Sequence, residues 1–387
     1  MMIKKNIKFI LVLIFMMASL FLGDVYGQAP FQVSGYVTEM PSYTWQRKSD
    51  KLWDNLIHNR IHLNYSNNEY SSIRIEVRNR FFLGETVRHT PLYKFYLNND
   101  PGWVDMSFNW GSSKSFVVNT VIDRLSYERS WGKWQLEAGR QRVSWSKSLV
   151  WNPNDVFNSY SYFDFDYEER PRMDGLHLTY DVDDEQRFEA VLKVDGSAKV
   201  TSALLYGFSK AGYDFQLLAG QMNQEDYLLG AGWSGSVADA GFYGELSFLS
   251  PINQKNDDIL VLSVGSNYTF HQSLTVRGEY LYSSNLNSSF EDFGSLIFYT
   301  SSIKKLSVTE HSYMLSVGCP VTPSLDVSLA YVGFSFPVLK SFYVSPAIEY
   351  SLNEQLSLSG IFQLYSHEWE GSDVLQISSF VRLKLFF

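Results

Sequence analysis

The sequence predicts an all-β protein, a closed transmembrane antiparallel β-barrel of about eighteen strands. Three observations support this fold class. Apolar and polar residues alternate over runs of roughly ten residues, every second connection between these runs is short, and aromatic residues make up 16% of the chain. After the N-terminus no apolar run approaches the length of a membrane-spanning helix, so a helical membrane protein is excluded.

The N-terminal residues predict a secretory signal. Lys4 and Lys5 precede a short apolar core, which ends at Val25-Tyr26-Gly27. This order of charged, apolar and cleavage-site residues is typical of a signal peptide. We therefore assign residues 1–27 to the signal and residues 28–387 to one barrel domain. A retained anchor helix is the alternative.

Strict alternation marks the individual strands. Within one of them, Arg74, Glu76, Arg78 and Arg80 alternate with apolar residues, so four charges share one face. A soluble sandwich could expose that face to water, and a barrel could turn it toward a water-filled lumen. The eighteen expected strands lie near residues 31–40, 56–66, 72–82, 119–129, 134–144, 174–181, 187–195, 200–209, 212–221, 226–235, 239–249, 259–270, 273–284, 310–319, 324–334, 341–351, 355–365 and 374–387.

The connections favour the barrel over the sandwich. Outer-membrane barrels alternate tight periplasmic turns with longer external loops, and the long connections here are 41–55, 83–118, 145–173 and 285–309. Residues 103–110 also alternate, but they would break this rhythm, so we expect a small hairpin inside the second long loop. Sixteen strands is the alternative count.

The end of the chain and its composition indicate which partners to expect and which to exclude. The final amphipathic strand ends at Phe387 and resembles the signal read by the barrel assembly machinery. We therefore expect the bacterial outer membrane, reached through the periplasm, as the location, with outer-membrane lipid and that machinery as partners. The net charge of −9 gives no nucleic-acid footprint, and the single Cys319 can form neither an internal disulfide nor a cysteine-based metal cluster.

Arginines gather on the polar faces of neighbouring strands. Charges in a low-dielectric wall create a strong field, and such a ladder can orient anions as they pass. An Arg–Glu network that only stiffens the wall is the equal alternative. The residues expected to face this path are Arg60, Arg74, Arg78, Arg80 and Arg124.

Arg140 conflicts with the alternation of its strand. The pattern from Trp134 onward would point its side chain at lipid, at a cost of about 2–4 kcal/mol in the middle of the membrane. A β-bulge at Gly139 would turn the side chain inward. A small error in the expected register is the alternative.

The segment that contains Arg140 carries a family resemblance. GRQRVSWSKSLVWNPNDVFN, followed by ERPRMDGLHLTY, resembles the Gly-Arg-Gln, Asn-Pro-x-Asp-x-Phe-Asn and Arg-Pro-x-x-Asp pattern of a group of bacterial outer-membrane barrels. These barrels are similar to the eighteen-stranded alginate-export porins. Ser146-Lys147 departs from the small residue usual after the tryptophan of the motif. The resemblance implies as site residues Arg140, Gln141, Trp145, Asn152, Asp155, Arg170 and Asp174.

These observations predict an outer-membrane porin or exporter for a small polar or anionic solute or a polysaccharide. We expect the 145–173 loop to fold into the lumen and constrict it, with Asp155 and Asp174 paired to Arg140 or Arg142. A tether without a role in transport is the alternative for these polar residues.

Two other classes of protein remain alternatives, a plugged structural or assembly barrel at the cell surface and a barrel enzyme. Ser144 and Lys147 have the Ser-x-x-Lys spacing of one enzyme class, but its helix start and companion motifs are not found. We predict no catalytic residue, metal or cofactor.

Overall fold

The computed structural model describes residues 30–47, 51–159, 172–253, 256–271, 273–285, 302–307, 309–335, 340–369 and 372–387. The predicted signal peptide and Arg170 lie outside these residues. No helix in the described part of the chain is long and apolar enough to cross a membrane.

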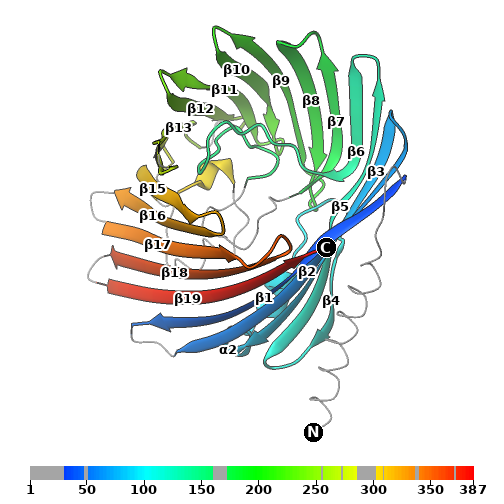
Figure 1. The fold of residues 1–387 in the computed structure, drawn as a ribbon. Coiled ribbons are helices and arrows are strands. Elements are labelled where there is room, and N and C mark those ends of the chain that lie inside the picture. The colour runs from blue at the N-terminus through cyan, green and yellow to red at the C-terminus, as the bar shows by residue number, and fades with distance from the viewer. Residues whose placement is uncertain are drawn as a thin grey trace.

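Strands dominate the fold (Figure 1). Two short helices, α2 (Glu85–His89) and α3 (Tyr93–Leu97), and one 3₁₀ turn, η1 (Ile303–Lys305), lie in connections. The strands are β1 (Phe31–Gln46), β2 (Leu52–Asn68), β3 (Ser71–Gly84), β4 (Ser107–Ser112), β5 (Phe116–Trp131), β6 (Trp134–Gln141), β7 (Met173–Asp181), β8 (Gln186–Val194), β9 (Val200–Lys210), β10 (Tyr213–Met222), β11 (Asp226–Val237), β12 (Ala240–Pro251), β13 (Ile259–Thr269), β14 (Thr275–Ser283), β15 (His311–Thr322), β16 (Leu325–Ser335), β17 (Lys340–Ser351), β18 (Leu356–Trp369) and β19 (Ser372–Phe386).

The strands form a closed antiparallel barrel. Each strand pairs with its neighbour in the sequence, except that β3 pairs directly with β5, and β19 pairs with β1 to close the ring. The sheet has 19 strands, and β4 is a short addition, so 19 − 1 = 18 strands form the ring. The predicted fold class and strand count are confirmed. Closure leaves no sheet edge exposed to lipid, as a membrane barrel requires.

The first predicted long connection, 41–55, is wrong. β1 continues through Pro41 to Gln46 and β2 begins at Leu52, so only residues 47–51 join the two strands. Pro41 lacks an N–H group and cannot donate to the ladder, yet it lies within β1. The two strands continue beyond it, and the rings of Tyr43 and Trp53 pack across the pair with centroids 4.4 Å apart.

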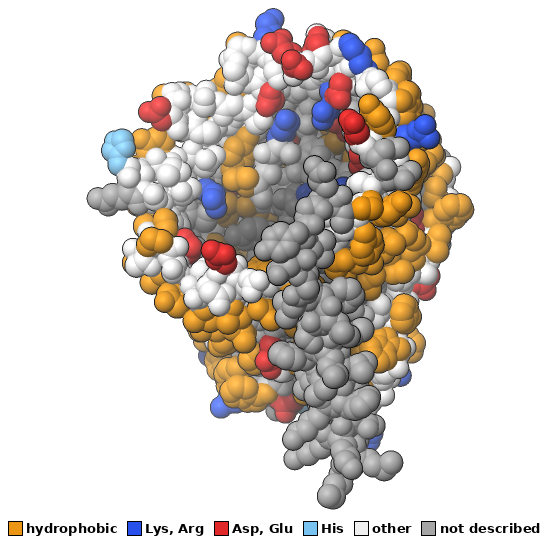
Figure 2. Space-filling view, turned by 45° about the vertical axis from the view of Figure 1, so that its right-hand side comes forward, with side chains coloured by type: hydrophobic (Ala, Val, Ile, Leu, Met, Phe, Trp, Pro, Cys, Tyr) orange, Lys and Arg blue, Asp and Glu red, His pale blue; other side chains and the backbone are white. Residues whose placement is uncertain are grey.

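The two faces of the wall differ in polarity. Leu315, Leu329 and Ile348 are exposed on the outside, while Ser312 and Ser359 are buried on the inside. Figure 2 shows hydrophobic side chains over much of the outer wall, and polar and charged side chains around the hollow at the mouth. This arrangement is typical of transmembrane barrels, whose outer surface meets lipid and whose lumen meets water.

The strand that pairs with one edge of β5 changes partway along β5. β6 pairs only with Leu125 to Trp131, and beyond that point β4 takes its place beside β5. At the change of partner the Ile122 N–H group donates to the Met106 carbonyl at 3.1 Å, and Arg140 Nη1 donates to the Ile122 carbonyl at 3.2 Å. Residues 103–110 therefore contribute to a hairpin with β5 inside the second long loop, close to the prediction.

The assignment of faces can be tested at two adjacent residues of β16. We expect Leu329→Arg, on the outer face, to reduce the free energy of unfolding by about 2–4 kcal/mol, because it places a cation in the hydrocarbon region. Ser328→Arg, on the lumen face, should change stability little and serves as the control. Reversible urea unfolding in lipid vesicles measures both, and equal losses would contradict the assignment.

Candidate functional site: a segment held across the lumen

Residues 142–159, which we call the inner segment, follow β6 and run inside the barrel (Figure 1). The segment contacts inward-facing residues of β8, β10, β12 and β14 rather than solvent beyond the rim. Trp145, Trp151 and Phe157 are each buried. The described part of the predicted 145–173 loop therefore does fold into the lumen.

Two carboxylates on the far wall hold the backbone of the inner segment. Glu279 of β14 accepts hydrogen bonds from the N–H groups of Leu149, Val150 and Trp151, the shortest at 2.6 Å from Trp151. Ser263 of β13 also donates to Glu279, at 3.1 Å. A carboxylate that accepts several N–H bonds satisfies both itself and the backbone donors of an irregular segment.

Glu245 of β12 accepts hydrogen bonds from backbone N–H groups on either side of residues 149–151. It accepts from the N–H groups of Lys147, of Ser148 at 2.6 Å, and of Asn154 at 2.8 Å. Its side chain is fully buried. Together the two glutamates accept six backbone N–H groups, three each, so we call this pair the glutamate clamp.

A turn and a close approach to a wall glycine fix the depth of the segment. Asp155 N–H donates to the Asn152 carbonyl at 3.1 Å, which closes a turn with Pro153 at its second position, where the fixed proline φ is favourable. Asn154 then donates to the Ala231 carbonyl of β11 at 2.8 Å. A Cβ added at Gly230 would lie 2.8 Å from Asn154 Oδ1, so this wall position is open only because it lacks a side chain.

Apolar contacts complete the attachment in two clusters. Val143, Trp145 and Phe157 pack against β7 to β13, and Val150 and Trp151 pack against β13 to β18. The indole N–H of Trp145 donates to Glu189 of β8 at 2.8 Å. Burial of these large side chains and the buried hydrogen bonds make the segment a fixed part of the barrel rather than a surface loop.

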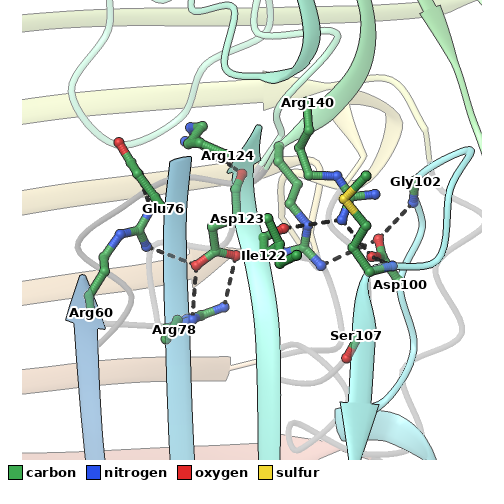
Figure 3. A network of polar contacts seen from close by, with 12 residues as sticks. Arg60, Glu76, Arg78, Asp100, Gly102, Ser107, Ile122, Asp123, Arg124 and Arg140 are labelled. Atoms are coloured by element: carbon green, nitrogen blue, oxygen red, sulfur yellow. Dashed lines mark hydrogen bonds and ion pairs between the residues drawn. The ribbon is translucent and has the colours of Figure 1, made fainter. Parts of the chain in front are cut away.

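A second cluster of charges is centred on Asp123 of β5 (Figure 3). Arg60 Nη1 and Arg78 Nε lie 2.9 and 3.1 Å from Asp123 Oδ2, and Arg172 Nη1 lies 2.9 Å from Oδ1. The register of β3 against β5 skips Asp123, so a β-bulge turns both Asp123 and Arg124 inward. The adjacent charged pair in an otherwise alternating strand is the sequence signal of this bulge, and Asp123 was not among the predicted site residues.

Arg140 ends β6 within a buried junction. Nε and Nη2 bond Asp174 at 2.6 and 2.8 Å, Nη1 bonds Asp100 at 2.7 Å, and the Val104 and Ile122 carbonyls accept the rest. All five guanidinium N–H donors are therefore used. Gly102 permits this approach, because a Cβ there would lie 2.1 Å from Arg140 Nη2.

The predicted bulge at Gly139 is wrong. The register of β6 runs through Gly139 without a shift against both β5 and β7, although its φ of +117° favours glycine. The residues between α3 and β4 cover Arg140 instead. Burial tends to raise the pKa of Asp100 in that segment, but the charge of Arg172, the N–H groups of Gly102 and Met106, and Arg140 hold it below its ordinary value.

The structure separates the predicted path residues into buried and accessible ones. Arg60 is buried, and it also pairs with Glu76 at 2.5 Å, while Arg124 is buried beside Asp123. Arg74 and Arg142 are exposed, and Arg80 is half-buried with Asn119 as a partner at 2.7 Å. Only this second group, with the half-buried Arg78, presents arginine surface to a solute.

The remaining predicted residues belong to the attachment of the segment. Gln141 is buried and donates to the carbonyls of Glu137 and Gly175 at 2.9 and 3.3 Å. Asn152 and Asp155 are buried within the turn. Asp174 pairs with Arg140 as expected, but the contacts to the far wall come from Glu245 and Glu279. The sequence analysis did not identify Glu245 or Glu279. The signal it could have used is that each is a single carboxylate at an inward position of its strand.

An acidic cavity of about 330 Å³ lies on the short-turn side of the inner segment. Its lining joins residues 144–147 to β7 through β10 and to the turn between β7 and β8. The ionisable residues of the lining are Lys147, Asp181, Asp183, Asp184, Glu185, Arg187, Glu189 and Asp214. Six carboxylates against two cations make this end of the lumen negative, in contrast to the arginine cluster on β2, β3 and β5.

Comparison with known proteins identifies the fold. The chain matches no family model and no curated protein sequence. It is similar in structure to OccK11 of Pseudomonas aeruginosa, with a TM-score of 0.58, 11% identity and coverage of 92% of this chain and 96% of that one. Against OprD of the same organism the TM-score is 0.57 at 9% identity, covering 95% and 99%.

OccK2 of Pseudomonas aeruginosa, solved in complex with glucuronate, gives a TM-score of 0.56 at 9% identity, covering 92% of this chain and 98% of that one. The fold is therefore that of the eighteen-stranded outer-membrane barrels. These similarities do not single out the alginate-export group suggested by the motif.

Removing the charge of the clamp should release the inner segment. In the double variant Glu245→Gln and Glu279→Gln each amide presents N–H donors toward backbone N–H groups, so several charge-assisted bonds are lost. We expect protease cleavage within residues 146–151 at least tenfold faster than in the wild type, with the barrel still heat-modifiable on gels. Glu349→Gln, a lumen carboxylate of β17 away from the segment, is the control. An unchanged cleavage rate would refute the clamp.

Removing Asp123 should be among the most destabilising substitutions in the wall. Asp123→Ala leaves Arg60, Arg78 and Arg172 close together without the shared acid, and breaking a buried pair on one side costs about 3–5 kcal/mol. Urea unfolding in vesicles gives the loss directly. Arg74→Gln on the same face should cost little, and a comparable loss there would mean that the face is generally sensitive.

Proposed function

We propose that the chain is a passive porin of the bacterial outer membrane for small polar solutes, with its bore set by the inner segment. The observation that carries this proposal is the glutamate clamp. A segment joined to the far wall through six backbone N–H groups stays at a constant depth, and a fixed constriction of a wide barrel limits the size of solute that passes.

The charges of the lumen support a preference for anions along one part of its wall only. Arg74, Arg78 and Arg80 lie on one inner face, while Asp183 and Asp184 line the cavity on the short-turn side. A solute in the lumen would therefore meet opposite fields on different parts of the wall. The glucuronate complex of the structurally similar OccK2 supports a small acidic sugar as one candidate solute. Export of a polysaccharide receives no such support.

Planar-bilayer recordings test the proposal. The wild type should conduct in discrete steps, and deletion of residues 146–166 should enlarge the conductance and admit larger sugars in liposome swelling, while the barrel stays heat-modifiable. An unchanged pore would mean that the segment does not set the bore. A change from no conductance to a large one would show a plugged barrel, the alternative class, and no conductance from either protein would reject the porin.

The same recordings separate the two charged regions. Arg74→Gln with Arg80→Gln should shift the reversal potential toward cations, because it removes accessible positive charge from the lumen. Asp183→Asn with Asp184→Asn should shift it toward anions. If neither pair moves the potential, these side chains do not face the ion path.

A further inference from the structure

A polar stripe crosses the lipid-facing side of β1, β2, β3 and β5. We define the stripe as Glu39, Asn55, Asn59, Asn79 and Thr120. Alternation places these side chains outward, because their strand neighbours Arg60, Arg78 and His58 point into the lumen. Tyr65 and Ile73, on the outward face of the same strands, are among the exposed large hydrophobic residues.

Asn59 of the stripe lies at the middle of the wall. On β2 the exposed aromatic residues Trp53 and Tyr65 mark the two ends of the outward face. Asn59 lies midway between them, six residues from each. On other strands apolar residues such as Leu246, Leu262 and Leu315 hold outward positions near the middle. Amide and carboxylate groups at this depth lose their hydration in lipid.

Part of the stripe is satisfied within the chain. Asn79 Nδ2 donates to Asn59 Oδ1 at 2.9 Å, Thr120 Oγ1 donates to Asn79 Oδ1 at 2.6 Å, and the indole N–H of Trp110 donates to Thr120 at 3.0 Å. This ladder runs from β2 through β3 and β5 to β4. Hydrogen bonding of this kind keeps polar groups tolerable in lipid, so the ladder by itself needs no partner.

The ends of the stripe are not satisfied. The carboxylate of Glu39 is exposed, and among the described residues its one hydrogen bond comes from Asn55 Nδ2 at 3.3 Å. Asn55 Oδ1 is buried without a hydrogen-bond partner in the part of the chain that the structure describes. The exposed carboxylate of Glu39 therefore remains as an acceptor on β1, while Asn59 Nδ2 donates to none of the described residues and supplies donors on β2.

We propose that this face docks a second copy of the same chain. Donors and acceptors on the adjacent strands β1 and β2 make the stripe self-complementary, so that Glu39 of one copy can accept from Asn59 of the next. Two copies that share a membrane orientation present the same depth to one another, as closed symmetric assemblies require. A lipid headgroup is the competing occupant, and retention of a lipid by a monomer would reveal it.

Light scattering of the mature protein in detergent and native mass spectrometry from lipid vesicles measure the number of copies. We expect an oligomer that is lost in the double variant Glu39→Leu and Asn59→Leu, with heat-modifiable migration retained. Ser266→Leu, an exposed polar position on β13, is the matched control and should leave the oligomer unchanged. A monomeric wild type overturns the proposal.

Cysteine cross-linking keeps the test independent of the stripe residues themselves. In a Cys319→Ser background, Ile61→Cys beside the stripe should cross-link between copies through a flexible bismaleimide in native membranes, and Leu262→Cys on β13 should not. Equal yields at both positions indicate random collision and overturn the proposal. A monomer that retains a lipid which Glu39→Leu releases assigns the stripe to lipid instead, and also overturns it.

Discussion

The requirement that no backbone edge be left in lipid governs this structure. β5 is 16 residues long, but its neighbour β6 has 8 and then turns into the lumen, which would leave half of β5 without a partner. β4 fills that place, and Arg140 and Met106 satisfy the Ile122 carbonyl and N–H at the junction. The inner segment can therefore leave the wall without breaking the closure of the barrel.

The polar groups of the interior follow from the same requirement. An irregular segment inside a barrel carries backbone N–H groups that no ladder satisfies, and here two glutamates supply the acceptors. The glutamates in turn are buried polar groups, and several donors surround each one and offset the cost of burial. Segment and wall are thus mutually dependent, and this dependence makes a constant bore physically reasonable.

Burial decides whether the charge of an arginine is accessible from the lumen or enclosed by carboxylates. Arg60 and Arg140 carry the same formal charge as Arg74, but their guanidinium groups are enclosed by Asp123, Glu76, Asp100 and Asp174. Their ion pairs join β2 to β3 and β5, and β6 to β7. The sequence left an ion path and a wall network equally weighted, and these two buried arginines have the contacts of a wall network.

The sequence by itself predicted a barrel of about eighteen strands, because period-two alternation and alternating connection lengths are local properties. It also predicted the inward fold of the loop, from the length of the loop, its Trp145 and Trp151 and its mixed Arg and Asp content. It also placed Arg140 and Asp174 in one motif and left Arg140 and Arg142 as alternative partners of Asp174. The roles of Glu245 and Glu279 were decided by tertiary structure alone, because a single carboxylate gives no sign of the segment, 91–98 residues from Glu245 and 128–130 from Glu279, that it will bind. The path of β1 through Pro41 and the β4 insertion likewise depend on which strand edges remain open once the ring has closed.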